Sequence, residues 1–207
     1  MSLSPFFTYL VIIVSAIFHE YAHGLMAYEL GDDTAKRAGR LTLNPIPHLD
    51  PFGTIILPLL LLFSSGIFIG WAKPVPYNPY NLSDKKYGSL KVALAGPAAN
   101  LSIAAVFGLF IRFVAPFLVS YGLLSANAIF FLELVVYTNI VLAVFNLIPI
   151  PPLDGSEIVA VLFPKYFRHF LKLGYIGIFI ALLVAFVFIS PISEAIFYLL
   201  IGSSLVF

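Results

Sequence analysis

Long apolar stretches separated by short polar segments make up most of the chain. A helix needs about 20 apolar residues to cross the roughly 30 Å hydrocarbon core of a bilayer. Apolar stretches long enough to do so cover residues 6–30, 52–71, 90–119, 126–149 and 174–207, and Pro191 interrupts the last one. Because proline removes a helical hydrogen bond and clashes with the preceding turn, we expect it to divide that stretch into two helices. The pattern predicts an all-α polytopic membrane protein with about five to six transmembrane helices.

The stretch 52–71 has two interpretations. Pro58 and the sequence Ser64-Ser65-Gly66 would break a helix, which favours a re-entrant segment that enters the membrane and returns. A plain spanning helix is the alternative. In the re-entrant case ten of the eleven Lys and Arg residues fall on one side of the membrane, against a seven-to-four split if the segment crosses. The positive-inside tendency therefore favours a re-entrant segment, with the basic loops on the cytoplasmic side.

Composition excludes several classes of protein. Of the 207 residues, 61% are hydrophobic and only 10% are charged, whereas soluble domains carry about a quarter charged residues. The net charge of +1 gives no electrostatic basis for binding nucleic acid. Because the chain has no cysteine, any metal must be bound by nitrogen and oxygen. We see no repeat and no second soluble domain, so we expect a single domain over 1–207, with its core at about 6–160 and C-terminal helices at about 174–207.

The first apolar stretch contains the sequence His19-Glu20-Tyr21-Ala22-His23. On a helix, positions i and i+4 share a face, so both imidazoles can bind one metal ion while Glu20 acts as a general base on water. Incidental polar residues are the alternative. A charged group near the centre of a membrane helix costs about 2.5–3.5 kcal/mol, however, and such groups are usually functional. The motif therefore predicts a membrane-embedded zinc metalloendopeptidase of the HExxH type.

A catalytic zinc needs a third protein ligand, and Asp154 is the candidate. It follows a segment with three prolines, 149–152, which cannot continue a helix. The chain should unwind there, with Gly155 allowing a tight reversal and Ser156 available to cap the next helix. From spacing alone Asp154 is either a metal ligand or an ordinary helix N-cap.

Two sequences together, HEYAH and NLIPIPPLDG, make the chain resemble the site-2 protease family of intramembrane zinc metalloproteases. The segments GRLTLNP, HLDPFGT, GWAKPVP and ALAGPAANL resemble the minimal branch of that family, which lacks a PDZ domain. The resemblance covers roughly residues 15–160. It implies that His19, His23 and Asp154 hold one Zn²⁺ and that Glu20 activates water. It also implies that Asn146 and Asn100 help to position the scissile carbonyl.

The same resemblance implies a place and a substrate. Peptide bonds would be hydrolysed within or near transmembrane segments of single-span membrane proteins, as in regulated intramembrane proteolysis. The protein would lie in a prokaryotic cell membrane with its active site toward the cytoplasmic side, and a regulatory membrane partner fits the same picture. The oligomeric state is left open.

Helical substrates must be unwound before hydrolysis, and edge strands of the protein could pair with the unwound peptide. Arg40 to Leu43 alternates with period two, and 71–77 is punctuated by proline. Both segments are predicted to form short β-strands at the membrane edge. Polar side chains could admit water, and Asn100 and Asn146 are the best candidates because both are expected beside helix breaks.

Three other functions compete. An inactive pseudo-enzyme or chaperone is disfavoured because Glu20 is intact. A membrane zinc transporter without protease activity would use paired histidines, although a transport path needs further polar sites and the sequence shows one dense cluster. The membrane zinc proteases that trim prenylated peptides would require a glutamate ligand on a later helix, and the proline-rich segment before Asp154 argues against that.

Overall fold

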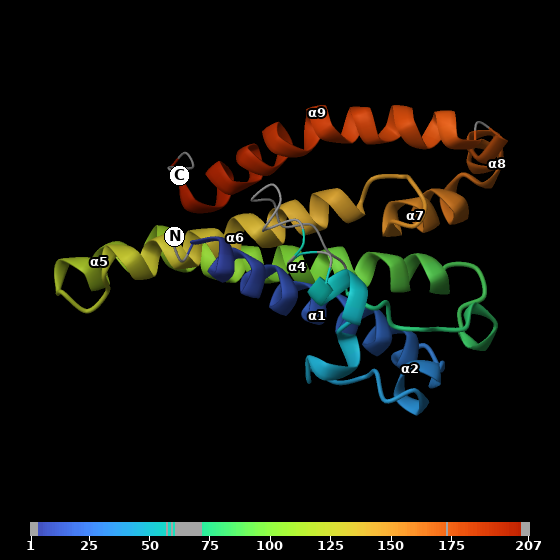
Figure 1. Ribbon diagram of the computed structural model, residues 1–207, viewed down its shortest axis with the longest axis horizontal. Helices are drawn as coiled ribbons and strands as arrows, with labels where there is room; N and C mark the ends of the chain where they lie inside the picture. Colours follow the sequence, from blue (N-terminus) through green and yellow to red (C-terminus); the bar gives the residue numbers. More distant parts are fainter. Residues whose placement is uncertain (1–3, 57, 59, 61–71, 173, 204–207) are drawn as a thin grey trace. The chain divides into compact units, whose positions relative to one another are not determined.

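The computed structural model describes residues 4–56, 58, 60, 72–172 and 174–203, and no strand occurs among them (Figure 1). The chain divides into two compact units, Met1–Gly96 and Pro97–Phe207, and the boundary falls inside one helix, α4 (Gly88–Phe113). The expectation of a single domain stays a prediction. Most of the stretch 52–71 lies outside the described residues, so the expectation that it is re-entrant stays a prediction.

The first unit begins with a long helix, α1 (Ser4–Glu29), which covers the first apolar stretch. This helix ends where Gly31 adopts a left-handed φ of 98°, a conformation common just past a helix C-terminus. Among the described residues between α1 and α4 are the short elements α2 (Thr34–Arg37), 3-10 turns at Ile46–His48 and Pro79–Asn81, and a π-helical turn at Pro51–Ile56.

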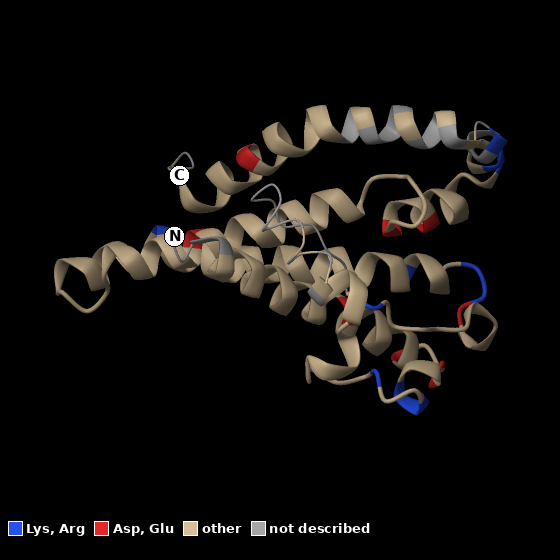
Figure 2. Cartoon of the chain, viewed as in Figure 1, with Lys and Arg blue, Asp and Glu red and all other residues tan. Residues whose placement is uncertain are grey.

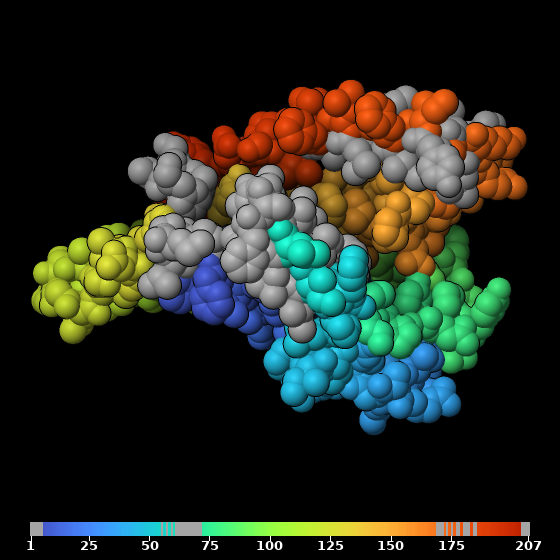
Figure 3. All heavy atoms as spheres, viewed as in Figure 1, coloured from blue at the N-terminus to red at the C-terminus, as the bar shows by residue number. Residues whose placement is uncertain are grey.

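A buried carboxylate ties these turns together beyond α1. Asp32 is fully buried and accepts hydrogen bonds from the backbone and hydroxyl of Thr34, the backbone of Asn78 at 2.6 Å and the side chain of Asn81 at 2.8 Å. Burial by itself raises the pKa of Asp32, but these hydrogen bonds outweigh it and hold that pKa below its ordinary value. In the space-filling view the side chains of residues 31–51 and 72–90 lie against each other here (Figure 3).

The expected edge strands are not observed among the described residues. Residues 41–43 form bends, and 72–78 is irregular. The physical reason is that the groups a strand ladder would use are bonded elsewhere. The carbonyl of Thr42 contacts Nε2 of the His48 ring at 2.8 Å, and the N–H of Lys73 donates to the His48 carbonyl at 2.9 Å. Pro74 and Pro76 have no N–H to donate.

The second unit is helical along most of its length. Ala104 and Ile111 of α4 pack with Val136 and Ile140 of α6, and with Phe197 and Ile201 of α9, in one buried cluster. Helices α6 and α9 run side by side in Figure 1. The helices after α4 are α5 (Ala115–Ser120), α6 (Ala126–Asn146), α7 (Asp154–Leu162), α8 (Pro164–Lys172) and α9 (Gly174–Ile201).

Single prolines do not break the long helices, which corrects two expectations. Helix α9 continues through Pro191 instead of dividing there, and α4 continues through Pro97, so Asn100 is not beside a helix break. One proline removes one hydrogen bond, and a long apolar helix tolerates that loss when neighbours pack against it. The three prolines between Pro149 and Pro152 do end α6, as expected.

Three described helices are long and apolar enough to cross a membrane: Phe6–Glu29, Gly88–Phe113 and Ala126–Asn146. Figure 2 shows that charged residues lie mainly at helix ends and in loops. In α4, for example, the two charged residues are Lys91 in the first turn and Arg112 in the last. The structure is therefore that of an all-α membrane protein, while the expected total of five to six spans stays a prediction.

Candidate metal centre

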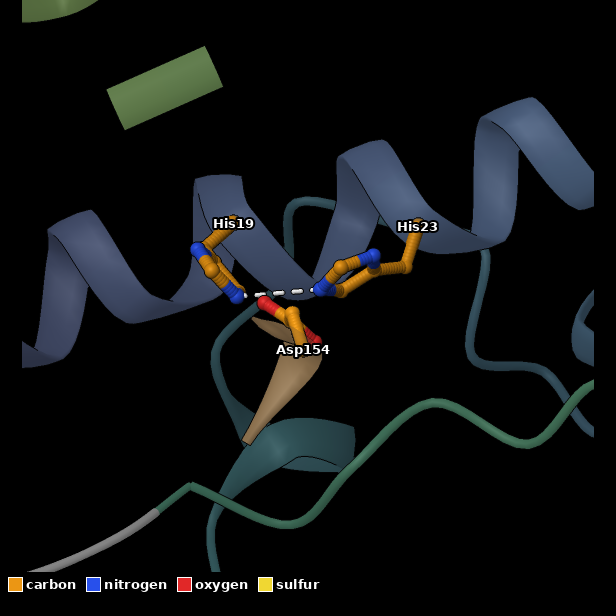
Figure 4. Close-up of side chains that lie close together, drawn as sticks. All are labelled: His19, His23 and Asp154. Carbon is orange, nitrogen blue, oxygen red and sulfur yellow. Dashed lines mark hydrogen bonds between the residues drawn. The ribbon is translucent and has the colours of Figure 1, made fainter. Parts of the chain in front are cut away.

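The sequence HEYAH lies on one continuous helix, and both of its imidazoles are buried. His19 and His23 occupy successive turns of α1, with ring centroids 4.6 Å apart (Figure 4). Their Nε2 atoms lie 3.0 Å apart, and Figure 4 shows the rings pointing toward each other. Two nitrogen ligands of a tetrahedral zinc, each bound at about 2.0–2.1 Å, are about 3.3–3.4 Å apart. The pair therefore fits a shared metal ion with a shift of a few tenths of an ångström.

A second contact fixes the orientation of one ring. Nδ1 of His23 lies 2.7 Å from the carbonyl oxygen of Val92 at the start of α4. When Nδ1 carries the proton and donates to this oxygen, Nε2 presents its lone pair toward His19. Metal-binding histidines commonly use such a hydrogen bond to set the tautomer and the ring orientation.

One turn beyond Val92, Gly96 makes room for the imidazoles. A Cβ at Gly96 would lie 2.5 Å from Nε2 of His19 and 2.6 Å from its Cε1, and still closer to Nε2 of His23. No side chain larger than hydrogen fits there without displacing both rings. The backbone of α4 therefore forms one wall of the space beside the two nitrogen ligands.

Glu20 is also held by a specific contact. Its Oε2 accepts the backbone N–H of Val75 at 2.8 Å, across 55 residues of sequence. Glu20 directly follows His19 in the sequence HEYAH, the position that a general base occupies in motifs of this type. A carboxylate in that position could accept a proton from water.

In the second unit, Asp154 is the first residue of α7 and not its N-cap. Leu153 occupies the N-cap position and provides no side-chain cap. Ser156 lies inside the helix, where its hydroxyl donates to the Leu153 carbonyl at 2.7 Å, so the expectation that it caps α7 is wrong. A leucine N-cap is compatible with this because Ser156 also donates its backbone N–H to that carbonyl, at 3.0 Å.

Gly155 lies in the first turn of α7 and does not have a positive φ, so the tight reversal expected at this residue is not observed. A Cβ there would collide with the carbonyl oxygens of Leu147 and Ile148, which are backbone atoms that cannot swing away. Its role is thus close backbone approach. The start of α7, with the Asp154 carboxylate drawn in Figure 4, is folded back against the end of α6.

The two asparagines predicted to position substrate have different surroundings within the second unit. Asn100 is fully buried and donates its side-chain N–H to Oδ1 of Asn139 at 2.8 Å, which joins α4 to α6. Asn146 is the last residue of α6 and donates to the Leu142 carbonyl at 3.0 Å. Substrate positioning by Asn146 and Asn100 stays a prediction.

Three contributors to this site were not predicted from the sequence, namely Val75, Val92 and Gly96. Two signals were present. Val92 and Gly96 are four residues apart and so share a helix face. Pro74 and Pro76 flank Val75 and leave it as the one N–H donor of that tripeptide. Neither signal identifies the partner, which lies on α1.

Comparisons with known proteins found one family profile and several relatives. A profile of Peptidase family M50 matches residues 116–190, a range that includes Asp154 but not α1. The Bacillus subtilis protein named "Putative zinc metalloprotease YwhC" is 40% identical over 188 residues, which cover 90% of this chain and 82% of YwhC. Rip2 of Mycolicibacterium smegmatis, which has the same description, is 33% identical over 146 residues, or 69% of this chain and 52% of Rip2.

A third relative, from Methanocaldococcus jannaschii, is 31% identical over 75% of this chain and 73% of its own length. The chain spans about half the length of Rip2. No solved structure matches this chain at a significant level. The chain is 40% identical to YwhC over nine tenths of its own residues, matches the family profile and has long apolar helices. The chain therefore belongs to the site-2 protease family, peptidase family M50, of membrane-associated zinc metalloproteases.

Proposed function

We propose that the chain is an intramembrane zinc endopeptidase that hydrolyses peptide bonds within or near transmembrane segments of membrane-protein substrates. His19, His23 and Asp154 are the ligands of one Zn²⁺, and Glu20 is the general base. The observation that carries this proposal is the 3.0 Å separation of two buried imidazole Nε2 atoms, one residue from a hydrogen-bonded carboxylate.

The donor set suits zinc. Each of the three residues offers one ligand atom, two imidazole nitrogens and one carboxylate oxygen, and such a set leaves a fourth position open. When bound, zinc polarises the scissile carbonyl and lowers the pKa of water to about 7. The space beside Gly96, which a Cβ would fill, supports the same assignment.

Glu20 performs the proton transfers. It takes a proton from the attacking water and then delivers it to the nitrogen of the leaving amine, so the carboxylate is regenerated in each cycle. His23 keeps its ring orientation through Val92 during this sequence. We assign positioning of the scissile carbonyl to Asn146 and Asn100.

Single-span membrane proteins are the proposed substrates, in a prokaryotic cell membrane with the site toward the cytoplasmic side, and a regulatory membrane partner belongs to the same proposal. The described apolar helices and the distribution of Lys and Arg support the location. The named relatives come from bacteria and an archaeon.

The decisive experiment compares Glu20→Gln with the matched change Glu29→Gln at the end of the same helix. Each protein is purified in detergent, zinc is counted per chain, and a panel of transmembrane peptides is tested for cleavage. We expect about one zinc per chain in the wild type and in both variants, and we expect hydrolysis to be lost only in Glu20→Gln. Hydrolysis by Glu20→Gln at the wild-type rate would refute the proposal. Zinc flux through vesicles that survives the substitution would instead indicate a transporter.

A second pair of variants tests the third ligand. Asp154→Asn removes a carboxylate and keeps the side-chain shape, and Glu157→Gln makes the same change one turn along α7. We expect zinc affinity to fall at least 100-fold in Asp154→Asn and to stay near wild type in Glu157→Gln. Equal zinc affinity in both would exclude Asp154 as a ligand.

A further inference from the structure

Three backbone N–H groups of the segment 72–78 donate hydrogen bonds to other residues of the first unit. Lys73 donates to the carbonyl of His48 at 2.9 Å, Val75 to Oε2 of Glu20 at 2.8 Å, and Asn78 to Oδ2 of Asp32 at 2.6 Å. Pro74 and Pro76 have none to give. Val75 therefore carries the single N–H of the tripeptide 74–76, and that N–H points at the carboxylate of the proposed general base.

The Val75 side chain contacts the same helix one turn later. Val75 is buried, and a Cβ at Gly24 would lie 3.0 Å from its Cγ1. Glu20 and Gly24 are four residues apart on α1, so they share a face. The backbone of Val75 thus meets Glu20, while its side chain rests on Gly24. With Lys73 and Asn78 bonded on either side, this placement is set before any substrate arrives.

We propose that Val75 is a positioning residue for the general base. Its N–H holds Oε2 of Glu20, which leaves Oε1 to take the proton from water and return it to the leaving amine. The proposal rests on the proposed function of Glu20. A free glutamate side chain rotates about several bonds, and a hydrogen bond to a charged carboxylate is strong enough to select one orientation.

The same contacts argue against pairing of this segment with substrate. An edge strand would present the N–H groups of alternate residues such as Lys73 and Val75 to an incoming strand. Both groups already have partners in the first unit. The segment serves Glu20 and does not supply those two donors to a peptide.

The test removes the N–H without changing the side chain. Val75 is replaced by its α-hydroxy acid in the full-length chain, so that an ester oxygen stands where the N–H was. The matched control is the same ester at Ser83, whose N–H donates to the Leu30 carbonyl at 2.7 Å. Val75→Ala, which keeps the N–H, is the conservative variant, and Val75→Pro removes the N–H by ordinary mutagenesis.

We expect the Val75 ester and Val75→Pro to lower kcat roughly 10- to 100-fold, with KM within about twofold and zinc content unchanged. Val75→Ala should retain most of the activity, and the Ser83 ester should keep kcat near wild type. Gly24→Ala, whose Cβ presses on Val75, should give a smaller loss of kcat in the same direction.

The outcomes separate the two proposals. If Glu20→Gln is inactive but the Val75 ester keeps kcat within about threefold of wild type, positioning by Val75 is overturned and the proposed function stands. A rise in kcat would also overturn it, because the contact would then be inhibitory. If Glu20→Gln still hydrolyses peptides, the proposed function fails first. Loss of zinc from the Val75 ester would assign the contact a structural role and overturn the proposal as well.

Discussion

Replacing Gly96 by alanine should weaken zinc binding at least 100-fold while leaving α4 folded. The added Cβ would lie 2.5 Å from Nε2 of His19 and closer still to Nε2 of His23, whereas ordinary van der Waals contact begins near 3.4 Å. The His19 ring must therefore retreat by about 0.9 Å. Alanine is favoured over glycine in a helix interior by about 1 kcal/mol, so the helix itself should gain stability.

A displacement of 0.9 Å is large for a metal site. Zinc–nitrogen bonds tolerate about 0.2 Å, and a misplacement of about 1 Å costs on the order of 100-fold in function. A factor of 100 corresponds to about 2.7 kcal/mol. We therefore expect zinc affinity and peptide hydrolysis by Gly96→Ala to fall at least 100-fold together, with helical content unchanged.

The assay is competition with a chromophoric chelator, followed by peptide cleavage at saturating zinc. The matched control is Gly108→Ala, farther along α4, where the added Cβ would lie 2.9 Å from Cβ of Leu200 in α9. This variant should lose thermal stability but keep its zinc. Zinc affinity in Gly96→Ala equal to that of wild type would refute the reasoning, because the space beside the imidazoles would then not be the metal site.

Three further predictions concern other parts of the chain. Asp32→Asn should lower the stability by about 2–3 kcal/mol at neutral pH, because hydrogen bonds to a charged carboxylate are lost. The Asp32 pKa is lowered on folding, so wild type should lose this advantage as pH falls below about 4, and the melting temperatures of the two proteins should converge there. Gly155→Ala should lower both melting temperature and zinc content, since backbone carbonyls block the new Cβ; unchanged values would contradict that packing. In the cysteine-free chain, Lys85→Cys and Leu123→Cys should react with an impermeant maleimide from opposite sides of sealed membranes, and labelling from one side would refute the proposed orientation.

Some features follow from local rules that act within a few residues. The i, i+4 spacing brings His19 and His23 together on any α-helix, and the chain around them is apolar enough to form one. Three prolines end α6 for steric reasons that need no tertiary partner. For such features the sequence alone was sufficient, because the interacting groups are close along the chain.

Other features depend on which backbone lies opposite. Pro97 and Pro191 look like helix breakers in the sequence, yet α4 and α9 run through them. Asn100 could face substrate or a neighbouring helix, and only the packing of α4 on α6 gives it Asn139 as a partner.

The sequence predicts the chemical groups of the candidate site but not the contacts that hold these groups in place. His19, Glu20 and His23 could be chosen by residue type and spacing, while spacing alone left Asp154 as either a metal ligand or a helix N-cap. Gly96 and Val75 could not be chosen in this way. Gly96 contributes by having no side chain and Val75 contributes a backbone N–H, and nothing in the sequence shows which residues they contact. The sequence determined which groups could bind and react, whereas only the tertiary structure decided what holds them, since those contacts join residues 55 to 77 positions apart.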